Sequence, residues 1–243
     1  MNSKVESFLK SIGLVKTAVP GEIGLKLRAE KGKKVRFWVN GDSMEVNWGD
    51  GSRSGIKRCS EYFEHTYTLS QLYEVHISGK GIVDLDIKRC GLTELEVNGC
   101  PSLEFLDCSE NDLTELDVRN CRHLYELYCG HNRIRDLKLK KYHKLCFLSC
   151  PCNELEEIKL DGCRKLYNLI CKSNRLERLD VSKCRQLATV NVEKNWMDSE
   201  ALNQFLSTLT VHPLNNKGLV ILRHNRGSNY DSEIYKAKGW WEM

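Results

Sequence analysis

This sequence of 243 residues has no long hydrophobic run, no strong net charge and no apolar stretch near its start. No apolar run approaches the roughly 18 residues of a membrane-spanning helix, so we expect no integral membrane span. Residues 1–20 carry Lys4, Lys10 and Lys16 without a continuous apolar region, so we expect no signal peptide. A chain that had lost its leader would look the same. The net charge of +4 is mild, and we expect no nucleic-acid partner.

The motifs of common enzyme classes are also missing. The sequence contains no G-x-S-x-G, no phosphate-binding loop, no H-E-x-x-H and no dinucleotide fingerprint. Its seven histidines do not recur with acids at a spacing that indicates a site. We therefore expect a protein that is not an enzyme, with no catalytic residues, no cofactor and no metal. A hydrolase whose triad comes from distant loops remains a third alternative, because such a site leaves no local motif.

What the sequence does contain is a repeat of 21 residues. Its mark is an asparagine column, spaced 21 apart: Asn111, Asn132, Asn153, Asn174 and Asn195. An apolar frame precedes each asparagine, as Leu124, Leu127 and Cys129 precede Asn132. A unit this short cannot bury its own apolar face, so neighbouring copies must stack into a solenoid. A second apolar trio in each copy predicts two extended segments per coil, with parallel strands about 4.8 Å apart.

The pattern L-x-x-L-x-L-x-x-N-x-L, with cysteine at the third apolar site, resembles the leucine-rich repeats common in bacterial surface and secreted proteins. Residues 113–118 and 176–184 carry the closest phrases. The resemblance implies a leucine-rich repeat solenoid, rich in β-structure, with thin coils and a parallel β-sheet. One truncated and five full repeats are expected over 82–196.

Twelve cysteines raise the question of disulfides, and their spacing argues against them. Two columns recur with the repeat: Cys100, Cys121, Cys163 and Cys184, with Tyr142 in the missing place, and Cys108, Cys129, Cys150 and Cys171. Stacked positions point inward with parallel Cβ vectors, which suits buried free thiols. Reduced thiols favour a cytoplasmic protein; the alternative is an exported or cell-surface protein. Cys146, Cys152 and His143 lack the converging spacing of a zinc site.

The segments around the repeats have their own patterns. Residues 1–33 form an N-terminal segment for which a helix is the expectation, and 34–81 alternate like strands, with a hairpin turn expected at Asn40–Gly41. The phrases Trp48–Gly51 and His65–Tyr67 resemble those of PKD-type β-sandwich modules. We expect Asp50 to cap its own Gly-flanked turn. Residues 197–243 predict a helix-strand-helix cap ending in Trp240 and Trp241.

A site for function follows from the solenoid pattern. With the columns in the core, the positions between them on each predicted strand face outward, and several are apolar. Clustered outward apolar residues mark interaction surfaces. The partner-binding candidates are Phe105, Asp107, Glu126, Tyr128, Phe147, Ser149, Asn168 and Ile170. We expect a protein partner. The alternative is a cell-surface or secreted carbohydrate-binding protein that stacks sugar rings on Tyr128 or Trp240.

Overall fold

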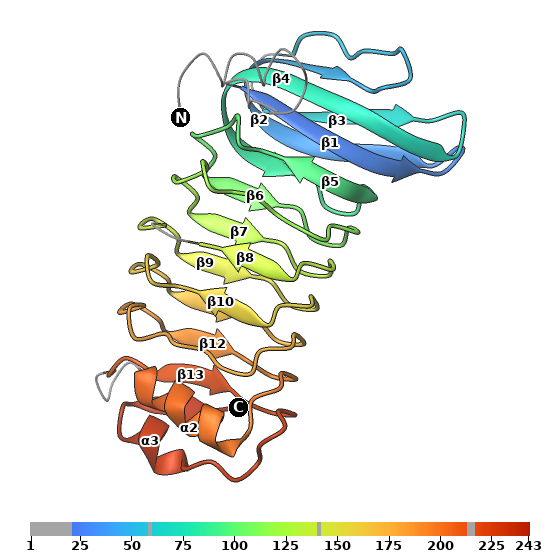
Figure 1. Cartoon of the computed structure of the whole chain (residues 1–243). Coiled ribbons are helices and arrows are strands. Elements are labelled where there is room, and N and C mark those ends of the chain that lie inside the picture. The colour runs from blue at the N-terminus through green and yellow to red at the C-terminus, as the bar shows by residue number, and fades with distance from the viewer. Residues whose placement is uncertain (1–20, 58–59, 140–141, 213–216) are drawn as a thin grey trace, which may run out of the picture.

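The computed structural model describes residues 21–57, 60–139, 142–212 and 217–243. The molecule is elongated: a β-rich module stands at one end, thin coils follow, and a short helical segment lies at the other end (Figure 1). In the part of the chain that the structure describes, no helix is long and apolar enough to cross a membrane.

The N-terminal module is built from four antiparallel strands. They are β1 (Glu22–Ala29), β2 (Lys34–Asn47), β3 (Glu61–Thr66) and β4 (Gln71–Asp86). Along β1, alternate side chains are buried, which is the pattern of a strand with one face on a core. The start of β2 pairs with β3 and with the end of β4, whereas its later residues pair with the middle of β4.

Two expectations for this region are wrong. Residues 22–29 belong to the N-terminal segment for which a helix is the expectation, but they form β1; residues 1–20 lie outside the described residues. The hairpin expected at Asn40–Gly41 does not form, because β2 runs through both residues. Gly41 serves close packing instead of a turn: a Cβ there would lie 3.1 Å from Ile82 Cγ1 and 3.2 Å from the carbonyl oxygen of Lys80.

The coils after the module form one long parallel sheet. Its strands are β6 (Phe105–Asp107), β7 (Glu126–Tyr128), β9 (Phe147–Ser149), β11 (Asn168–Ile170), β12 (Thr189–Asn191), β13 (Gly218–Ile221) and β14 (Trp240–Glu242). The middle residues are in register, as Leu106 pairs with Leu127 and Leu127 with Leu148, and all three are fully buried. The predicted apolar frame is therefore the core, and the parallel sheet is confirmed.

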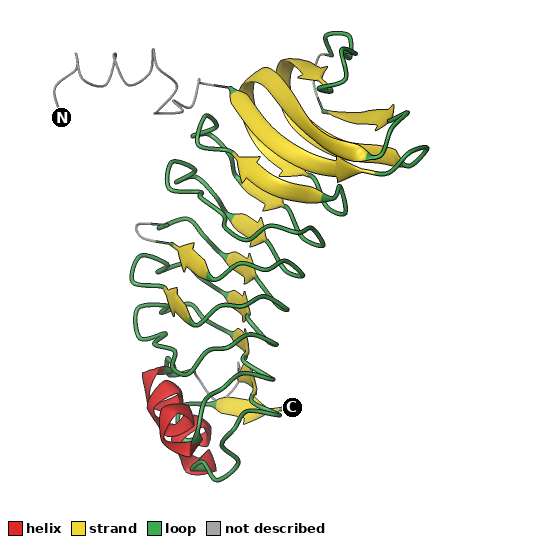
Figure 2. Ribbon diagram, turned by 45° about the vertical axis from the view of Figure 1, so that its right-hand side comes forward, coloured by secondary structure: helices red, strands yellow, loops and turns green. Residues whose placement is uncertain are grey.

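A second, shorter set of strands lies on the other side of the coils (Figure 2). It contains β5 (Leu92–Glu96), β8 (Asp136–Lys138) and β10 (Glu157–Lys159). β8 and β10 pair in parallel. Glu96, the last residue of β5, forms an isolated parallel bridge with Asp117 of the next coil. The N-terminal module joins both strand sets: the end of β4 pairs with β6, and β1 pairs with β5. The solenoid thus continues the module's sheet with no intervening linker.

The asparagine column is buried and hydrogen-bonded across coils. Asn132 Oδ1 accepts from the backbone N–H of Leu113 at 2.9 Å, and its Nδ2 donates to the carbonyl oxygens of Cys108 and Cys129 at 3.0 and 3.2 Å. Asn153, Asn174 and Asn195 repeat this arrangement one coil further each time. The column satisfies backbone groups that the tight coil turns would otherwise leave without partners.

The structure extends this column at both ends. Cys90 occupies the place 21 residues before Asn111, and its thiol donates to the carbonyl oxygens of Arg36 and Lys88. At the other end, Asn225 Nδ2 donates to the carbonyl oxygens of Val192 and Leu222. Asn225 follows β13, so this strand belongs to a further coil that the 21-residue spacing does not reveal. The insertion before β13 breaks the period.

The cysteine columns are also as expected. The described cysteines are free, and nine of them are buried. Burial raises the pKa of Cys121, Cys163, Cys171 and Cys184 to about 12. Tyr142 fills the gap in the first column, where it is fully buried and its hydroxyl donates to the carbonyl oxygen of Val118.

Replacing Tyr142 with cysteine should lower the free energy of unfolding by about 2–4 kcal/mol. The change completes the cysteine column, but it removes a buried ring and leaves a cavity that the neighbouring coils cannot close. Urea unfolding followed by circular dichroism measures the effect. Tyr167→Cys is the matched control, because Tyr167 is 48% exposed. Equal stability changes for the two variants would contradict the packed column.

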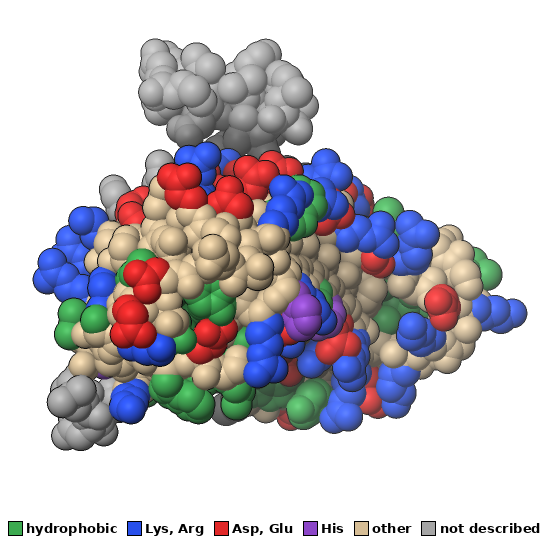
Figure 3. All heavy atoms as spheres, turned by 90° about the horizontal axis from the view of Figure 1, so that it is seen from below, with side chains coloured by type: hydrophobic (Ala, Val, Ile, Leu, Met, Phe, Trp, Pro, Cys, Tyr) green, Lys and Arg blue, Asp and Glu red, His purple; other side chains and the backbone are tan. Residues whose placement is uncertain are grey.

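The C-terminal segment contains α2 (Ser199–Thr208), β13, α3 (Ser232–Lys236) and β14. Asp198 caps α2 by accepting from the backbone N–H of Ala201, and the helix buries Leu202, Phe205 and Leu206. Viewed from this end, the molecule shows charged side chains of both signs (Figure 3).

Candidate interaction face

The outward positions of the long sheet bring together all eight candidate residues. They lie in two rows: Phe105, Glu126, Phe147 and Asn168 in the first, and Asp107, Tyr128, Ser149 and Ile170 in the second. Each is half-buried by its neighbours along the sheet. Short parallel strands make this arrangement, because successive side chains point to opposite faces of a strand. The middle residue of each three-residue strand therefore points inward, and its two neighbours point outward. We call these two rows the sheet face.

Aromatic and acidic side chains contact one another within the sheet face. The rings of Phe105 and Tyr128 are tilted with centroids 5.7 Å apart. The Tyr128 hydroxyl donates to Glu126 Oε2 at 2.8 Å, and burial, together with Glu126, raises the pKa of Tyr128 to about 12. Asp107 Oδ1 accepts from the backbone N–H of Ser109 at 2.9 Å. Among the described residues, Asn168 Oδ1 is buried without a hydrogen-bond partner.

Sequence reasoning missed the part of this face that the N-terminal module supplies. The end of β4 pairs with β6, so Asp84 lies beside Phe105 and Asp86 beside Asp107. The start of β2 pairs with the same part of β4, which brings Trp38 to the edge of the face. Alternation in the sequence places Trp38 on a strand, but it does not say which strand is its neighbour.

Two exposed tyrosines were also missed. Tyr125 and Tyr167 are 50% and 48% exposed and stand directly before the first outward position of their strands. Cys146 holds the equivalent position between them, and backbone hydrogen bonds join these three residues from coil to coil. An aromatic residue one position before the outward pair is visible in the sequence at both places. The alternation rule, however, identifies as outward only the two residues that flank the inward one.

A depression lies where the module meets the first coils. Its volume is about 430 Å³, and its lining residues are Trp38, Asp84, Glu104, Phe105, Tyr125 and Glu126. Three of these are aromatic and three are acidic. Asp84 Oδ2 accepts from Asn40 Nδ2 at 2.7 Å. This depression adjoins the candidate residues, since Phe105 and Glu126 belong to both.

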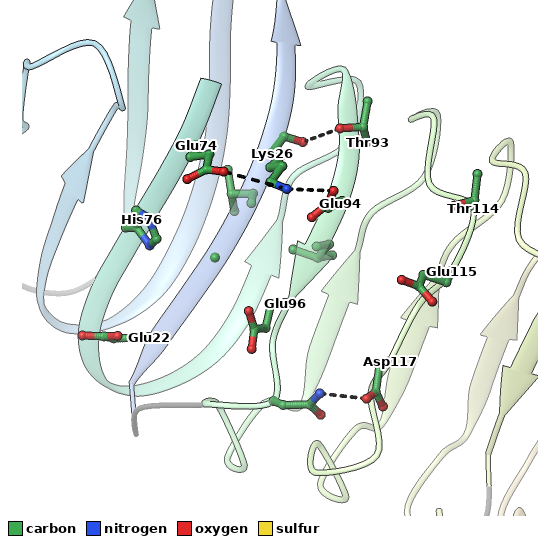
Figure 4. A pocket seen from close by; sticks show the side chains of 14 residues that line it. Glu22, Lys26, Glu74, His76, Thr93, Glu94, Glu96, Thr114, Glu115 and Asp117 are labelled. Carbon is green, nitrogen blue, oxygen red and sulfur yellow. Dashed lines mark hydrogen bonds and ion pairs between the residues drawn. The ribbon is translucent and has the colours of Figure 1, made fainter. Parts of the chain in front are cut away.

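A larger, acidic groove of about 660 Å³ lies on the other strand set, between β1, β4, β5 and the following coil (Figure 4). Lys26 crosses part of it, with its Nζ 2.9 Å from Glu94 and 3.8 Å from Glu74. Hydrogen bonds from Arg119 and Asn98 lower the pKa of Asp117 to about 2, although burial opposes this shift. Its other acids include Glu96 and Glu115.

The Asp50–His65 pair of the module is a structural contact. Asp50 Oδ1 accepts from the backbone N–H of Ser52 at 3.0 Å, so the expected turn cap is confirmed, and Oδ2 lies 2.7 Å from His65 Nε2. Burial raises the pKa of Asp50, but hydrogen bonds from Ser52 and His65 outweigh it and lower the pKa to about 2. The Ser52 hydroxyl donates to Asp50 and not to the imidazole, which is not the order of a catalytic triad.

The residues of the conceivable zinc site do not converge. Cys146 is half-exposed directly before β9, and Cys152 lies in a turn with φ of 54°. Within the described ranges, no three His, Cys, Asp or Glu side chains are grouped so that they could hold a metal ion.

Comparison with known proteins supports the fold. Residues 101–141 match the family described as Leucine Rich repeats (2 copies). No curated protein matches the chain. Among solved structures it is similar to the functional domain of InlJ from Listeria monocytogenes, described as including a cysteine ladder, with 28% identity and a TM-score of 0.51 over 63% of this chain. YopM from Yersinia enterocolitica WA-314 is similar in fold, with 21% identity and a TM-score of 0.52 over 66% of this chain.

This chain spans 32% of the length of each of those two structures. The match to the family, the similar structures and the register of buried residues from Leu106 on β6 to Val220 on β13 agree with one another. The repeats of this chain are leucine-rich repeats, and its fold is a leucine-rich repeat solenoid.

Proposed function

We propose that this chain is a non-enzymatic interaction protein that binds a protein partner through the sheet face. The observation that carries this proposal is the apolar stripe on the face. Phe105, Tyr128, Phe147 and Ile170 lie on four neighbouring strands, and none of them is buried in the core. Aromatic side chains that are partly exposed and held by a rigid sheet are the usual anchors of protein interfaces.

The general behaviour of the repeat class supports the same proposal. Leucine-rich repeat proteins commonly act through protein–protein contacts, and the parallel sheet offers a continuous surface for them. The exposed rings of Tyr125 and Tyr167 widen the stripe on one side. Tyrosine contributes a large contact area at small conformational cost, which suits a binding surface.

The triple change of Phe105, Tyr128 and Phe147 to serine should weaken binding of the partner by at least about 100-fold. Each truncated anchor removes apolar contact area from the centre of the interface. The measurement has two steps: affinity capture with cross-linking identifies the partner of the unchanged chain, and calorimetry with the purified partner then gives the dissociation constants.

The control carries three serines on the opposite strand set, at Lys138, Glu157 and Lys159. These side chains are exposed on β8 and β10, far from the sheet face. The control should bind like the unchanged chain, and both variants should keep its circular dichroism spectrum. Binding that survives the triple change on the sheet face, or that is lost in the control, would refute the proposed face.

We further infer that residues 34–81 form a PKD-like module. Trp48 stacks on His65 with ring centroids 4.9 Å apart, and the Tyr67 hydroxyl donates to the carbonyl oxygen of Trp48 at 2.9 Å. The residues of the two phrases that suggested this resemblance therefore contact one another.

Carbohydrate binding is the second candidate function. The exposed ring of Trp241 supports it, since Trp241 pairs with Leu219 at the end of the long sheet and is 46% exposed. Trp240, the residue first considered for stacking, is 2% exposed and donates to the carbonyl oxygen of Thr210. A glycan array probed with the unchanged chain and with the Trp241→Ala variant tests this alternative. If the unchanged chain binds no glycan, or if the variant binds equally well, carbohydrate binding through Trp241 is refuted.

A further inference from the structure

We propose that the depression between the N-terminal module and the first coils binds an arginine side chain of the protein partner. The proposal rests on the proposed function, because it assumes that the partner lies along the sheet face. It adds the chemistry of one contact, at the residues Trp38, Asp84, Glu104, Phe105, Tyr125 and Glu126. We call this site the aromatic–acidic depression.

The charges of the depression favour a cation. Its three carboxylates share one hollow, and no lysine, arginine or histidine is among its lining residues. Among the described residues, none of the three takes part in an ion pair. Asp84 and Glu126 each accept one hydrogen bond from a neutral group, from Asn40 and Tyr128, through a single oxygen. Carboxylates that line the same hollow repel one another, and a bound cation would relieve this repulsion.

The walls of the depression favour an organic cation over a metal ion. Trp38 on β2, Phe105 on β6 and Tyr125, directly before β7, line the depression together with the carboxylates. An aromatic face attracts a guanidinium or ammonium group but offers no ligand atom to a hydrated metal. In agreement, no grouping of metal ligands occurs within the described residues.

Arginine fits this combination better than lysine. Its planar guanidinium stacks on aromatic rings while its N–H groups donate to carboxylates at the sides, whereas an ammonium group is a compact and strongly hydrated charge. The chain itself uses such stacking on its surface. The Arg36 guanidinium lies 3.9 Å from the ring centre of Tyr62, and that of Arg226 lies 4.4 Å from that of Trp196.

The position of the depression points to a side chain of the partner. Phe105 and Glu126 belong both to the depression and to the sheet face, so a chain that packs on the apolar stripe passes its rim. Tyr125 is half-exposed and Glu104 is exposed at this rim. A partner segment with an arginine next to its apolar anchors would then place the charge and the apolar groups in one continuous contact.

The test uses three short probes: N-acetylated, C-amidated Gly-Arg-Gly, Gly-Lys-Gly and Gly-citrulline-Gly. Each is titrated into the full chain, and the indole N–H signal of Trp38 is followed by nuclear magnetic resonance. We expect saturable shifts with the arginine peptide, at least about threefold weaker binding of the lysine peptide, and no saturation with the neutral citrulline peptide. Equal binding of arginine and citrulline, or no shift of Trp38 with arginine, overturns the proposal.

Variants connect these shifts to the depression. The double change Glu104→Gln and Glu126→Gln should weaken the arginine peptide by about tenfold, since it removes two charges and keeps the side-chain size. The matched control is Glu96→Gln with Glu115→Gln in the acidic groove on the other strand set, which should leave binding unchanged. Equal weakening by both double variants overturns the assignment to the depression.

The same variants separate this inference from the proposed function. The partner should bind the Glu104→Gln and Glu126→Gln variant at least about tenfold more weakly. If the partner binds more weakly when Phe147 and Tyr128 are changed but equally well when the two glutamates are changed, the arginine contact is refuted and the proposed sheet face is retained. An arginine peptide that binds in the depression, with a partner that ignores the apolar stripe, instead refutes the proposed function.

Discussion

Between about pH 9 and pH 10.5 this protein should lose its stability steeply and unfold in reducing buffer. The cause is the set of nine buried thiols. Burial holds the pKa of Cys108, Cys129 and Cys150 well above its ordinary value, raises that of Cys100 to about 11 and raises that of Cys90 to about 12. In the unfolded chain, all of these thiols ionise near pH 8.5.

The sign of the effect follows from proton binding. Above about pH 8.5 the unfolded chain loses its thiol protons while the folded chain keeps them, so rising pH favours the unfolded state. The stabilisation is fully present below that pH and is lost as the pH rises toward the folded values. Each buried thiol contributes a loss of about 1.4 kcal/mol per pH unit. Nine together exceed a typical stability of about 5–15 kcal/mol within one to two units.

The measurement is the urea midpoint by circular dichroism from pH 7 to pH 10.5, with a phosphine reductant present. A variant with Cys108, Cys129 and Cys150 changed to alanine should start from lower stability at pH 7 but show a shallower decline, because fewer thiols titrate on unfolding. Alkylation at pH 8 should modify Cys146 and Cys152 before the buried thiols. A midpoint that stays constant to pH 10, or equal slopes for the two proteins, would contradict the buried columns.

The change Asn132→Leu should lower the free energy of unfolding by about 3–5 kcal/mol. The backbone N–H of Leu113 has Asn132 as its hydrogen-bond acceptor and would remain buried without one. The carbonyl oxygens lose less. Cys108 also accepts from Asn111, and Cys129 also accepts from Asn153. Leucine further places methyl groups against polar backbone, which adds a packing penalty.

Thermal and urea unfolding of Asn132→Leu should be compared with those of Asn120→Leu. Asn120 is exposed, and its side chain makes one long hydrogen bond, from Nδ2 to the carbonyl oxygen of Asn98 at 3.3 Å, so its replacement should change stability by less than about 0.5 kcal/mol. If the two variants differ by less than a few tenths of a kcal/mol, the asparagine column does not stabilise the coils.

The inward half of this protein was predictable because it obeys a local rule. Leu124, Leu127 and Cys129 recur with a fixed period, and an apolar residue at a fixed place in a short coil has only the core to enter. The two columns of thiols, Tyr142 as the missing member, and the hydrogen-bonded asparagines all follow from that period. The C-terminal helix was predictable for the same kind of reason, since Leu202, Phe205 and Leu206 share one face.

The local backbone features that the sequence did not predict depend on contacts between segments far apart in the chain. The sequence Asn40–Gly41 is typical of a tight turn. In the structure, however, Ile82 and Lys80 lie so close to Gly41 that a side chain there would be crowded, and glycine avoids this. The residue before each column asparagine takes a left-handed backbone, with φ of 55° at His131 and 56° at Ser173. The sequence offers no glycine there, and hydrogen bonds to the adjacent coils hold this conformation.

The repeat, its inward columns and the two rows of outward residues, with Phe147 in one and Tyr128 in the other, could be read from the sequence, because spacing along the chain sets which way each side chain points. How the N-terminal module meets the coils could not be read in this way, because it depends on the tertiary structure. The pairing of β2 with β4, and of β4 with β6, brings Trp38 and Asp84 beside Phe105 across 67 and 21 positions of the chain. Which strands become neighbours depends on their register and on the core that they share. The local alternation of apolar and polar residues specifies neither of these.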